Sequence, residues 1–246
     1  MSVVIYKEGA VAGLLEIFSS RHELTQPAWY AFATEGNKHH VQAATSCSPN
    51  NSPWTFLPQT DLLPRPGQWV NATSPLIRAP DVQYLAETDS SVLYYSGLRA
   101  DSKYHCVGAA TAPNITGPYT PFHNPLFCPL AEGGAIDAAG YRDEGDGSRW
   151  VVYKVDGSAK GPGGPPCGNG EAPGEPTPLR LQRVEERDGV TLVGEPVTVL
   201  DRDPAVDGPL VEAPSLVRSR GVGGDGGCWR RRVGVSRRMS GRAVYV

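Results

Sequence analysis

A set of three strand-like segments recurs along the chain in the same order, and this recurrence limits the fold more than any other feature. The segments are rich in aromatic and β-branched residues, and no long stretch keeps a helical period. Two sets share an Ala-Ala-Thr element, at 43–45 and 109–111, 66 residues apart. The sets span 29–34, 41–45 and 54–57; 92–96, 107–111 and 119–122; and 150–155, 179–184 and 197–200. This pattern predicts an all-β chain of repeated units.

A further short strand precedes the second and third sets, which gives each unit four strands. These first strands are expected at 79–84 and 134–139, and the similar segment 211–217 would open a fourth unit. Repeated four-stranded antiparallel units are typical of a β-propeller, in which the first strand of each blade lines a central channel. The alternative is a β-sandwich whose hairpins are similar by chance.

Charge and composition argue against several classes of partner. With 246 residues, a formal net charge of -3 and a pI near 6.0, the chain gives no reason to expect nucleic acid or an anionic membrane surface as partner. No run approaches the roughly 20 apolar residues that span a bilayer. The five cysteines form no Cys-x-x-Cys pair, which argues against structural zinc and leaves one or two disulfides open. No motif implies a cofactor.

Three carboxylates, Asp81, Asp137 and Glu212, lie on the expected first strands of successive units. Ionised carboxylates are costly to bury among apolar residues, and grouped carboxylates shift one another's pKa values. Hydrolysis of a glycosidic bond needs such a group, because one carboxylic acid protonates the leaving oxygen while an ionised partner acts as base or nucleophile. Taken singly, Asp137 could instead form a turn and Glu212 could be a solvated charge at a strand end.

Four motifs follow one another along the chain, namely Ala79-Pro80-Asp81-Val82, Gly133-Gly134-Ala135-Ile136-Asp137, Tyr153-Lys154-Val155-Asp156-Gly157 and Asp207-Gly208-Pro209-Leu210-Val211-Glu212-Ala213-Pro214-Ser215-Leu216. In their order and spacing these motifs resemble glycoside hydrolase family 43 in the style of its fungal members. The resemblance covers residues 29–217 and implies a five-bladed β-propeller, here incomplete, with about three blades and the start of a fourth. It also implies a secreted enzyme that hydrolyses arabinan, arabinoxylan or derived oligosaccharides with inversion, although residues 1–20 hold no clear signal peptide.

The resemblance assigns roles to individual residues. Glu212 would be the general acid, and Asp137 would modulate and orient that acid. Asp81 would be a substrate-binding neighbour at the channel mouth. Trp69, which lies in a loop beside Gly67, is expected to stack on a sugar ring at the rim, although aromatic residues more often fill the core. Nothing identifies ligands for an ion at the propeller centre, so the metal stays unassigned.

Both ends depart from the family pattern, which predicts truncation or an altered reading frame at each end. The family places its general base, an Asp followed by Pro, roughly ten residues before the first strand, whereas residues 1–28 contain no Asp. Residues 218–246 carry eight Arg against the single acid Asp225 and are predicted to be disordered. The missing base favours a second function, a non-catalytic carbohydrate-binding propeller, over an enzyme whose activity is impaired.

Overall fold

The computed structural model describes residues 29–48, 52–161, 174–205, 207 and 210–216. The backbone alone is described at 3–4, 14–15, 217–219, 230–236 and 244–245. The chain divides into two compact units, residues 1–128 and 129–246, and each is described by itself. Strands dominate both units, and the described residues form only short 3-10 turns in addition. The all-β prediction is therefore confirmed.

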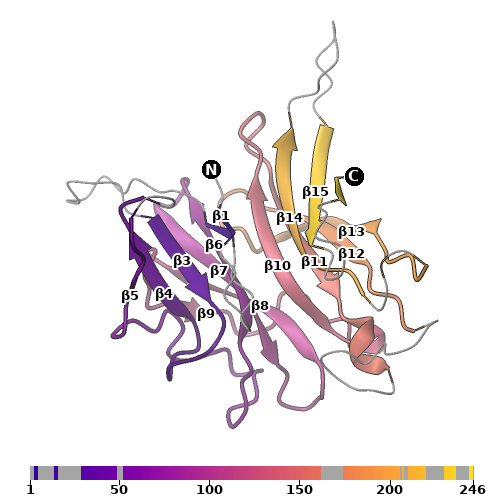
Figure 1. Ribbon diagram of the computed structural model, residues 1–246, viewed down its shortest axis with the longest axis horizontal. Coiled ribbons are helices and arrows are strands. Elements are labelled where there is room, and N and C mark those ends of the chain that lie inside the picture. The colour runs from indigo at the N-terminus through magenta and orange to yellow at the C-terminus, as the bar shows by residue number, and fades with distance from the viewer. Residues whose placement is uncertain are drawn as a thin grey trace, which may run out of the picture. The chain divides into compact units, whose positions relative to one another are not determined.

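The first unit contains a two-stranded sheet and two larger antiparallel sheets, and the strands of the larger sheets follow one another in chain order (Figure 1). Strand β1 (Val3–Val4) also pairs with β2 (Leu14–Leu15). The three-stranded sheet consists of β3 (Trp29–Ala33), β4 (Gln42–Ser46) and β5 (Thr55–Phe56). The four-stranded sheet consists of β6 (Arg78–Leu85), β7 (Ser90–Leu98), β8 (His105–Ala112) and β9 (Thr120–Pro121). The Ala-Ala-Thr elements lie in β4 and β8, at corresponding positions in the two sheets.

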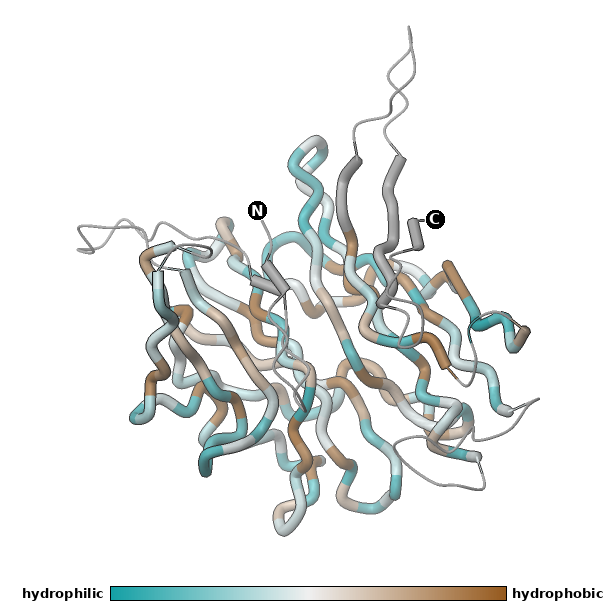
Figure 2. The backbone as a smooth tube through the Cα atoms, in the orientation of Figure 1, coloured by the Kyte–Doolittle hydropathy of each residue, from teal (hydrophilic) through white to brown (hydrophobic). Residues whose placement is uncertain are grey.

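The second unit repeats this arrangement. Its four-stranded sheet consists of β10 (Ala135–Arg142), β11 (Arg149–Val155), β12 (Leu179–Val184) and β13 (Leu192–Leu200), again in chain order. Short 3-10 turns cover Leu130–Glu132 and Gly157–Lys160. The loop that joins β10 to β11 is hydrophilic (Figure 2). Two four-stranded meanders thus occur where the repeat predicted them, whereas closure into five blades stays a proposal.

The other sheet of the second unit is built on the strand expected at 211–217. Strand β14 (Glu212–Ser219) pairs with β15 (Arg230–Ser236), which pairs with β16 (Val244–Tyr245). Strands β15 and β16 fall in the segment predicted to be disordered. In β15 the sequence alternates at Val233 and Val235, which is a strand signal. The other residues of 220–246, and the segment 16–28 expected to precede the first strand, lie outside the described residues.

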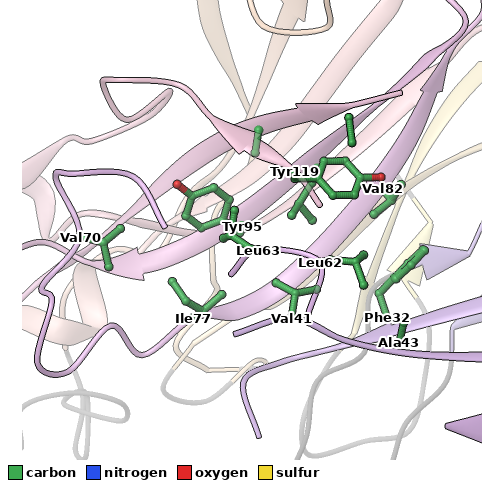
Figure 3. Packing of buried hydrophobic residues seen from close by; sticks show 13 residues of the cluster. Phe32, Val41, Ala43, Leu62, Leu63, Val70, Ile77, Val82, Tyr95 and Tyr119 are labelled. Atoms are coloured by element: carbon green, nitrogen blue, oxygen red, sulfur yellow. The ribbon is translucent and has the colours of Figure 1, made fainter. Parts of the chain in front are cut away.

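Hydrophobic packing fixes each unit. In the first unit, buried side chains from β3, β4, β6 and β7 meet Leu62 and Leu63 of the connecting loop (Figure 3). Each such leucine contributes about 2 kcal/mol by leaving water. In the second unit, Val152 and Leu179 of the four-stranded sheet pack with Leu216 of β14. This contact holds β14 beside β10 (Figure 1) and so brings the first strands of two consecutive sheets together.

Strands β6, β10 and β14, each the first strand of its sheet, carry the same irregularity. The pairing register shifts between residues 78 and 81 in β6, between 136 and 139 in β10, and between 212 and 214 in β14. A non-glycine residue with positive φ lies within each shift: Ala79 at 44°, Asp137 at 56° and Ala213 at 52°. Such β-bulges bend the strand and re-aim a side chain, and they are common beside active sites.

These bulges show that the three carboxylates do not occupy the same register position. Asp137 lies in its bulge, Glu212 immediately precedes the equivalent bulge residue, and Asp81 follows the equivalent residue by two. The three carboxylates therefore differ in their position relative to the bulge, although β6, β10 and β14 are each the first strand of their sheet.

Candidate active site

Asp137 of β10 and Glu212 of β14 are brought together in the second unit. The Oδ2 atom of Asp137 accepts a hydrogen bond of 3.1 Å from the backbone N–H of Ala213, the residue that follows Glu212. Asp137 is partly buried, whereas Glu212 keeps 25% of its side chain exposed. The pairing expected from the motifs is present in the structure, with the shorter carboxylate anchored to backbone and the longer one reaching toward solvent.

A buried lysine that the sequence analysis left without a role completes the group. Lys154 of β11 places its Nζ atom 2.9 Å from Oδ1 of Asp156 and 3.8 Å from Oε2 of Glu212. The Oγ of Ser158 donates a 2.7 Å hydrogen bond to the same Oδ1 of Asp156. The signal for this cluster was a lysine in the middle of the apolar strand Trp-Val-Val-Tyr-Lys-Val, followed two residues later by an acid.

Glycines allow the backbone around this cluster to approach closely. The N–H of Asp156 donates to the carbonyl of Gly134 at 2.9 Å. Gly133 has φ of 101°, and a Cβ there would lie 2.4 Å from the carbonyl oxygen of Asp156. A Cβ on Gly157 would lie 1.8 Å from the carbonyl oxygen of Pro176. Only glycine fits at such positions, which explains the Gly-Gly and Asp-Gly steps of the motifs in physical terms.

The pKa of Asp137 is raised from 3.8 to about 6. Burial is the largest cause, because it disfavours the charged carboxylate. The Lys154 ammonium opposes this rise, and the negative charge of Glu212 adds to it. The N–H of Ala213 lowers this pKa, and the charge of Asp156 raises it. A buried carboxyl with a raised pKa beside a second carboxyl is typical of an acid/base site.

This raised pKa predicts that Asp137→Asn changes stability in a pH-dependent way. Because the folded pKa lies above the unfolded value, the wild-type chain loses stability as pH rises from about 4 through about 6, where the buried carboxyl must ionise. The Asn variant lacks this loss and can still accept the Ala213 N–H. We expect it to gain about 1 kcal/mol in free energy of unfolding at pH 8, after allowance for solvent screening, and almost nothing at pH 4. Denaturant titrations at the two pH values measure the difference.

Asp188→Asn is the matched control. Burial raises the pKa of Asp188, but hydrogen bonds from Thr191 and Val190 outweigh it and the net shift is downward. Stability from this group is present above its unfolded pKa, so its Asn variant is expected to lose stability at pH 8. A gain of the same sign for both variants would contradict the assignment.

Asp81 and Trp69 belong to the first unit. Asp81 is 2% exposed and accepts a 2.9 Å hydrogen bond from Nε2 of Gln83. The indole of Trp69 stacks on Tyr95 with ring centroids 5.8 Å apart and packs against the hydrophobic cluster of Figure 3. Gly108 makes room for this ring, since a Cβ there would lie 2.5 Å from it. Trp69 thus packs against the core of the first unit. Substrate binding by Asp81 or Trp69 stays a prediction.

Other expected features have mixed outcomes. Cys106 and Cys128 form a disulfide, and Cys47 is exposed with a free thiol. Cys167 and Cys228 lie outside the described residues.

Within the described part of the chain, no group of three or more His, Cys, Asp or Glu side chains could hold a metal ion. The helices of that part include none with the length and apolar character needed to cross a bilayer.

Comparison with known proteins gives the fold. No family model and no curated protein matches the sequence. Among solved structures, a thermostable family-43 glycoside hydrolase aligns with a TM-score of 0.62 and 16% identity, over 96% of this chain and 72% of its own. An endo-arabinase from Bacteroides thetaiotaomicron aligns with a TM-score of 0.60 and 15% identity, over 94% and 78%. The GH43_1 enzyme from Xanthomonas citri, solved with xylotriose, aligns with a TM-score of 0.59 and 15% identity, over 100% and 76%.

These likenesses confirm the resemblance to family 43 at the level of the fold. The chain has the all-β fold of family-43 glycoside hydrolases, and its second unit carries a paired Asp and Glu on the first strands of two consecutive sheets. At identities of 15–16% the likeness establishes the fold alone.

Proposed function

We propose that this chain is a glycoside hydrolase that cleaves O-glycosidic bonds of arabinose- or xylose-containing plant polysaccharides, or of oligosaccharides derived from them. One observation carries the proposal. The carboxyl of Asp137 is hydrogen-bonded to the backbone N–H that follows Glu212, beside the buried Lys154, in a fold shared with family-43 enzymes. A raised carboxyl pKa beside a second, more exposed carboxyl is what acid/base hydrolysis of a glycoside requires.

Glu212 is the better candidate for the general acid. Its side chain is one methylene longer than that of Asp137 and is 25% exposed, so it can reach a glycosidic oxygen. Asp137 is held by the Ala213 amide and is suited to orient and modulate the acid. In the proposed inverting reaction, Glu212 gives its proton to the leaving oxygen as the bond to the anomeric carbon breaks. A water attacks that carbon from the opposite face and passes its proton to a base.

The base is the unassigned partner in this scheme. Inversion needs it about 6.5–9.5 Å from the acid, so that a water fits between the two carboxyls. The nearest carboxylates ahead of β3 are Glu16 and Glu23, which lie outside the described residues. We propose that turnover is impaired when neither carboxylate fills this role. Substrate binding by Asp81 and Trp69, which lie in the first unit, stays a prediction from the sequence.

The substrate class is chosen from chemistry and from the neighbours. A net charge of -3 suits a neutral sugar better than an anionic partner, and the neighbours include an endo-arabinase and an enzyme solved with xylotriose. An extracellular location and a five-bladed propeller are part of the same proposal, since plant polysaccharides lie outside cells.

Product stereochemistry tests the proposal. The purified chain is incubated with arabinan, arabinoxylan and xylotriose, and the anomer formed first is identified by proton NMR before it equilibrates. We expect release of pentose or pentose oligomers with inverted anomeric configuration. Retained anomeric configuration would contradict the inverting mechanism. Absence of sugar release from all three substrates would contradict the proposal that the chain is a glycoside hydrolase.

A carbohydrate-binding propeller is the second candidate, because residues 1–28 contain no Asp that could serve as the family's base. This candidate predicts that the chain binds arabinan or xylotriose in calorimetry, that no product forms, and that Glu212→Gln leaves the affinity unchanged. Hydrolysis by the wild-type chain that is lost in this variant excludes it.

A further inference from the structure

Lys154 is the most deeply buried cation beside the carboxylate pair. Its side chain is 1% exposed, and it lies in β11 between residues that fill the core. Removing an ammonium group from water costs several kcal/mol unless partners compensate it. Valine at this position would serve packing better. A lysine here therefore calls for an explanation in terms of what its charge does.

The charge is held mainly by Asp156. The 2.9 Å contact with Oδ1 of Asp156 is an ion pair, and Asp156 is fixed in turn by Ser158 and by the carbonyl of Gly134. The contact with Glu212 is longer, at 3.8 Å. Lys154 is thus anchored by Asp156 and presents its positive charge to Glu212.

We propose that Lys154 is the positioning residue of the Asp137–Glu212 pair: its ammonium, anchored by Asp156, orients Glu212 and balances the negative charge that the two carboxylates share. This inference rests on the proposed hydrolase function and names a part of its site beyond the two carboxylates. Three structural facts support it, namely the burial of Lys154, its two carboxylate contacts, and the hydrogen bonds that immobilise Asp156.

Electrostatics around Asp137 agree with this arrangement. The charged groups that act on this carboxyl are Lys154 and Asp156 from β11 and its following turn, and Glu212 from β14. Burial raises the pKa of Asp137, Lys154 lowers it, and the two acids raise it further. Loss of the ammonium removes the one favourable charge in this set, so Asp137 should keep its proton to higher pH.

The test compares Lys154→Met with Lys154→Arg. Methionine keeps length and removes charge, whereas arginine keeps the charge. Selective carbon-13 labelling of aspartate lets NMR follow the titration midpoint of Asp137 without any turnover. For K154M we expect the midpoint to rise by about 1 pH unit or more. We expect kcat to fall about a hundredfold through a misplaced acid, with little change in KM. K154R should restore the midpoint toward the wild-type value.

Two further variants serve as a replacement for K154M if it does not fold and as a matched control. K154M/D156N removes both charges of the ion pair, so no uncompensated carboxylate is left buried if K154M alone fails to fold. Lys160→Met is the matched control, because Lys160 also faces an acid, Glu175 at 3.7 Å, but both side chains are about one-third or more exposed. It should leave the midpoint and kcat unchanged.

The outcomes separate the inference from the function on which it rests. Folded K154M with a wild-type midpoint for Asp137 and a wild-type kcat overturns the role of Lys154, even when the chain hydrolyses arabinan or xylotriose. If K154M does not fold, a wild-type kcat in folded K154M/D156N overturns it, because loss of the Asp156 charge offsets part of the midpoint shift in that variant. A shifted midpoint in K154M, together with a wild-type chain that releases no sugar, supports the electrostatic role of Lys154 and contradicts the proposed hydrolase instead.

Discussion

Glu212→Gln is expected to lower kcat/KM about a thousandfold on natural oligosaccharides such as xylotriose. A sugar alkoxide is a poor leaving group unless the glycosidic oxygen is protonated as the bond breaks. The amide of Gln cannot supply that proton. On nitrophenyl glycosides the loss should be about tenfold, because nitrophenolate departs without protonation. Rates measured on both substrates, with saturating and limiting concentrations, separate the acid step from binding.

The control for this prediction is Glu195→Gln. Glu195 is an exposed glutamate on β13, within the same unit. Its variant should keep wild-type rates on both substrates. An equal loss on natural and nitrophenyl substrates in the Glu212 variant would argue against a general acid and for a binding or structural role.

Gly133→Ala is expected to lower the free energy of unfolding by about 3 kcal/mol. The new Cβ would lie 2.4 Å from the Asp156 carbonyl oxygen, and φ of 101° is a conformation that alanine rarely adopts. Overpacking and backbone strain each cost about 1–3 kcal/mol. Displacement of Asp156 should also move Lys154, so hydrolysis should fall together with stability. Denaturant unfolding and rate measurements on one preparation test both.

Gly194→Ala separates the cost of backbone strain from the cost of overpacking. Gly194 also has positive φ, 68°, but nothing lies within 4 Å of the position that its Cβ would take. Its variant should lose only the cost of backbone strain, about 1 kcal/mol. If both variants lose the same stability, the close approach of Gly133 to Asp156 contributes nothing.

The strand pattern was largely predictable from the sequence, since apolar and β-branched residues recur where the strands lie. Strand β13 shows the limit. The sequence predicted 197–200, whereas the strand begins at Leu192. Gly194 and Pro196 interrupt the pattern, yet β13 is the outer strand in its sheet order, where a proline N–H is not needed for a further ladder. Local propensity is overridden there by pairing with β12.

The candidate site was predictable in part. Order and spacing of the motifs indicated Asp137 and Glu212, and the structure brings them together. The bulges were not predictable, because Asp137 and Ala213 adopt positive φ without being glycine. Lys154 was overlooked because a lysine in a strand usually extends its ammonium to solvent, and only the fold shows that it turns to Asp156.

The hydrogen bond from Ala213 to Asp137 joins residues 76 positions apart and belongs to two different sheets. Each sheet is held by its own ladder, whereas this contact exists only while the sheets are docked through side chains such as Val152 and Leu216. Partial opening of that seam would leave both ladders intact and still abolish the alignment of the acid. If the proposed hydrolysis depends on this alignment, we expect its resistance to heat to follow the packing between the two sheets. Substitutions that strengthen this packing should then extend the working temperature range even where they leave either ladder unchanged.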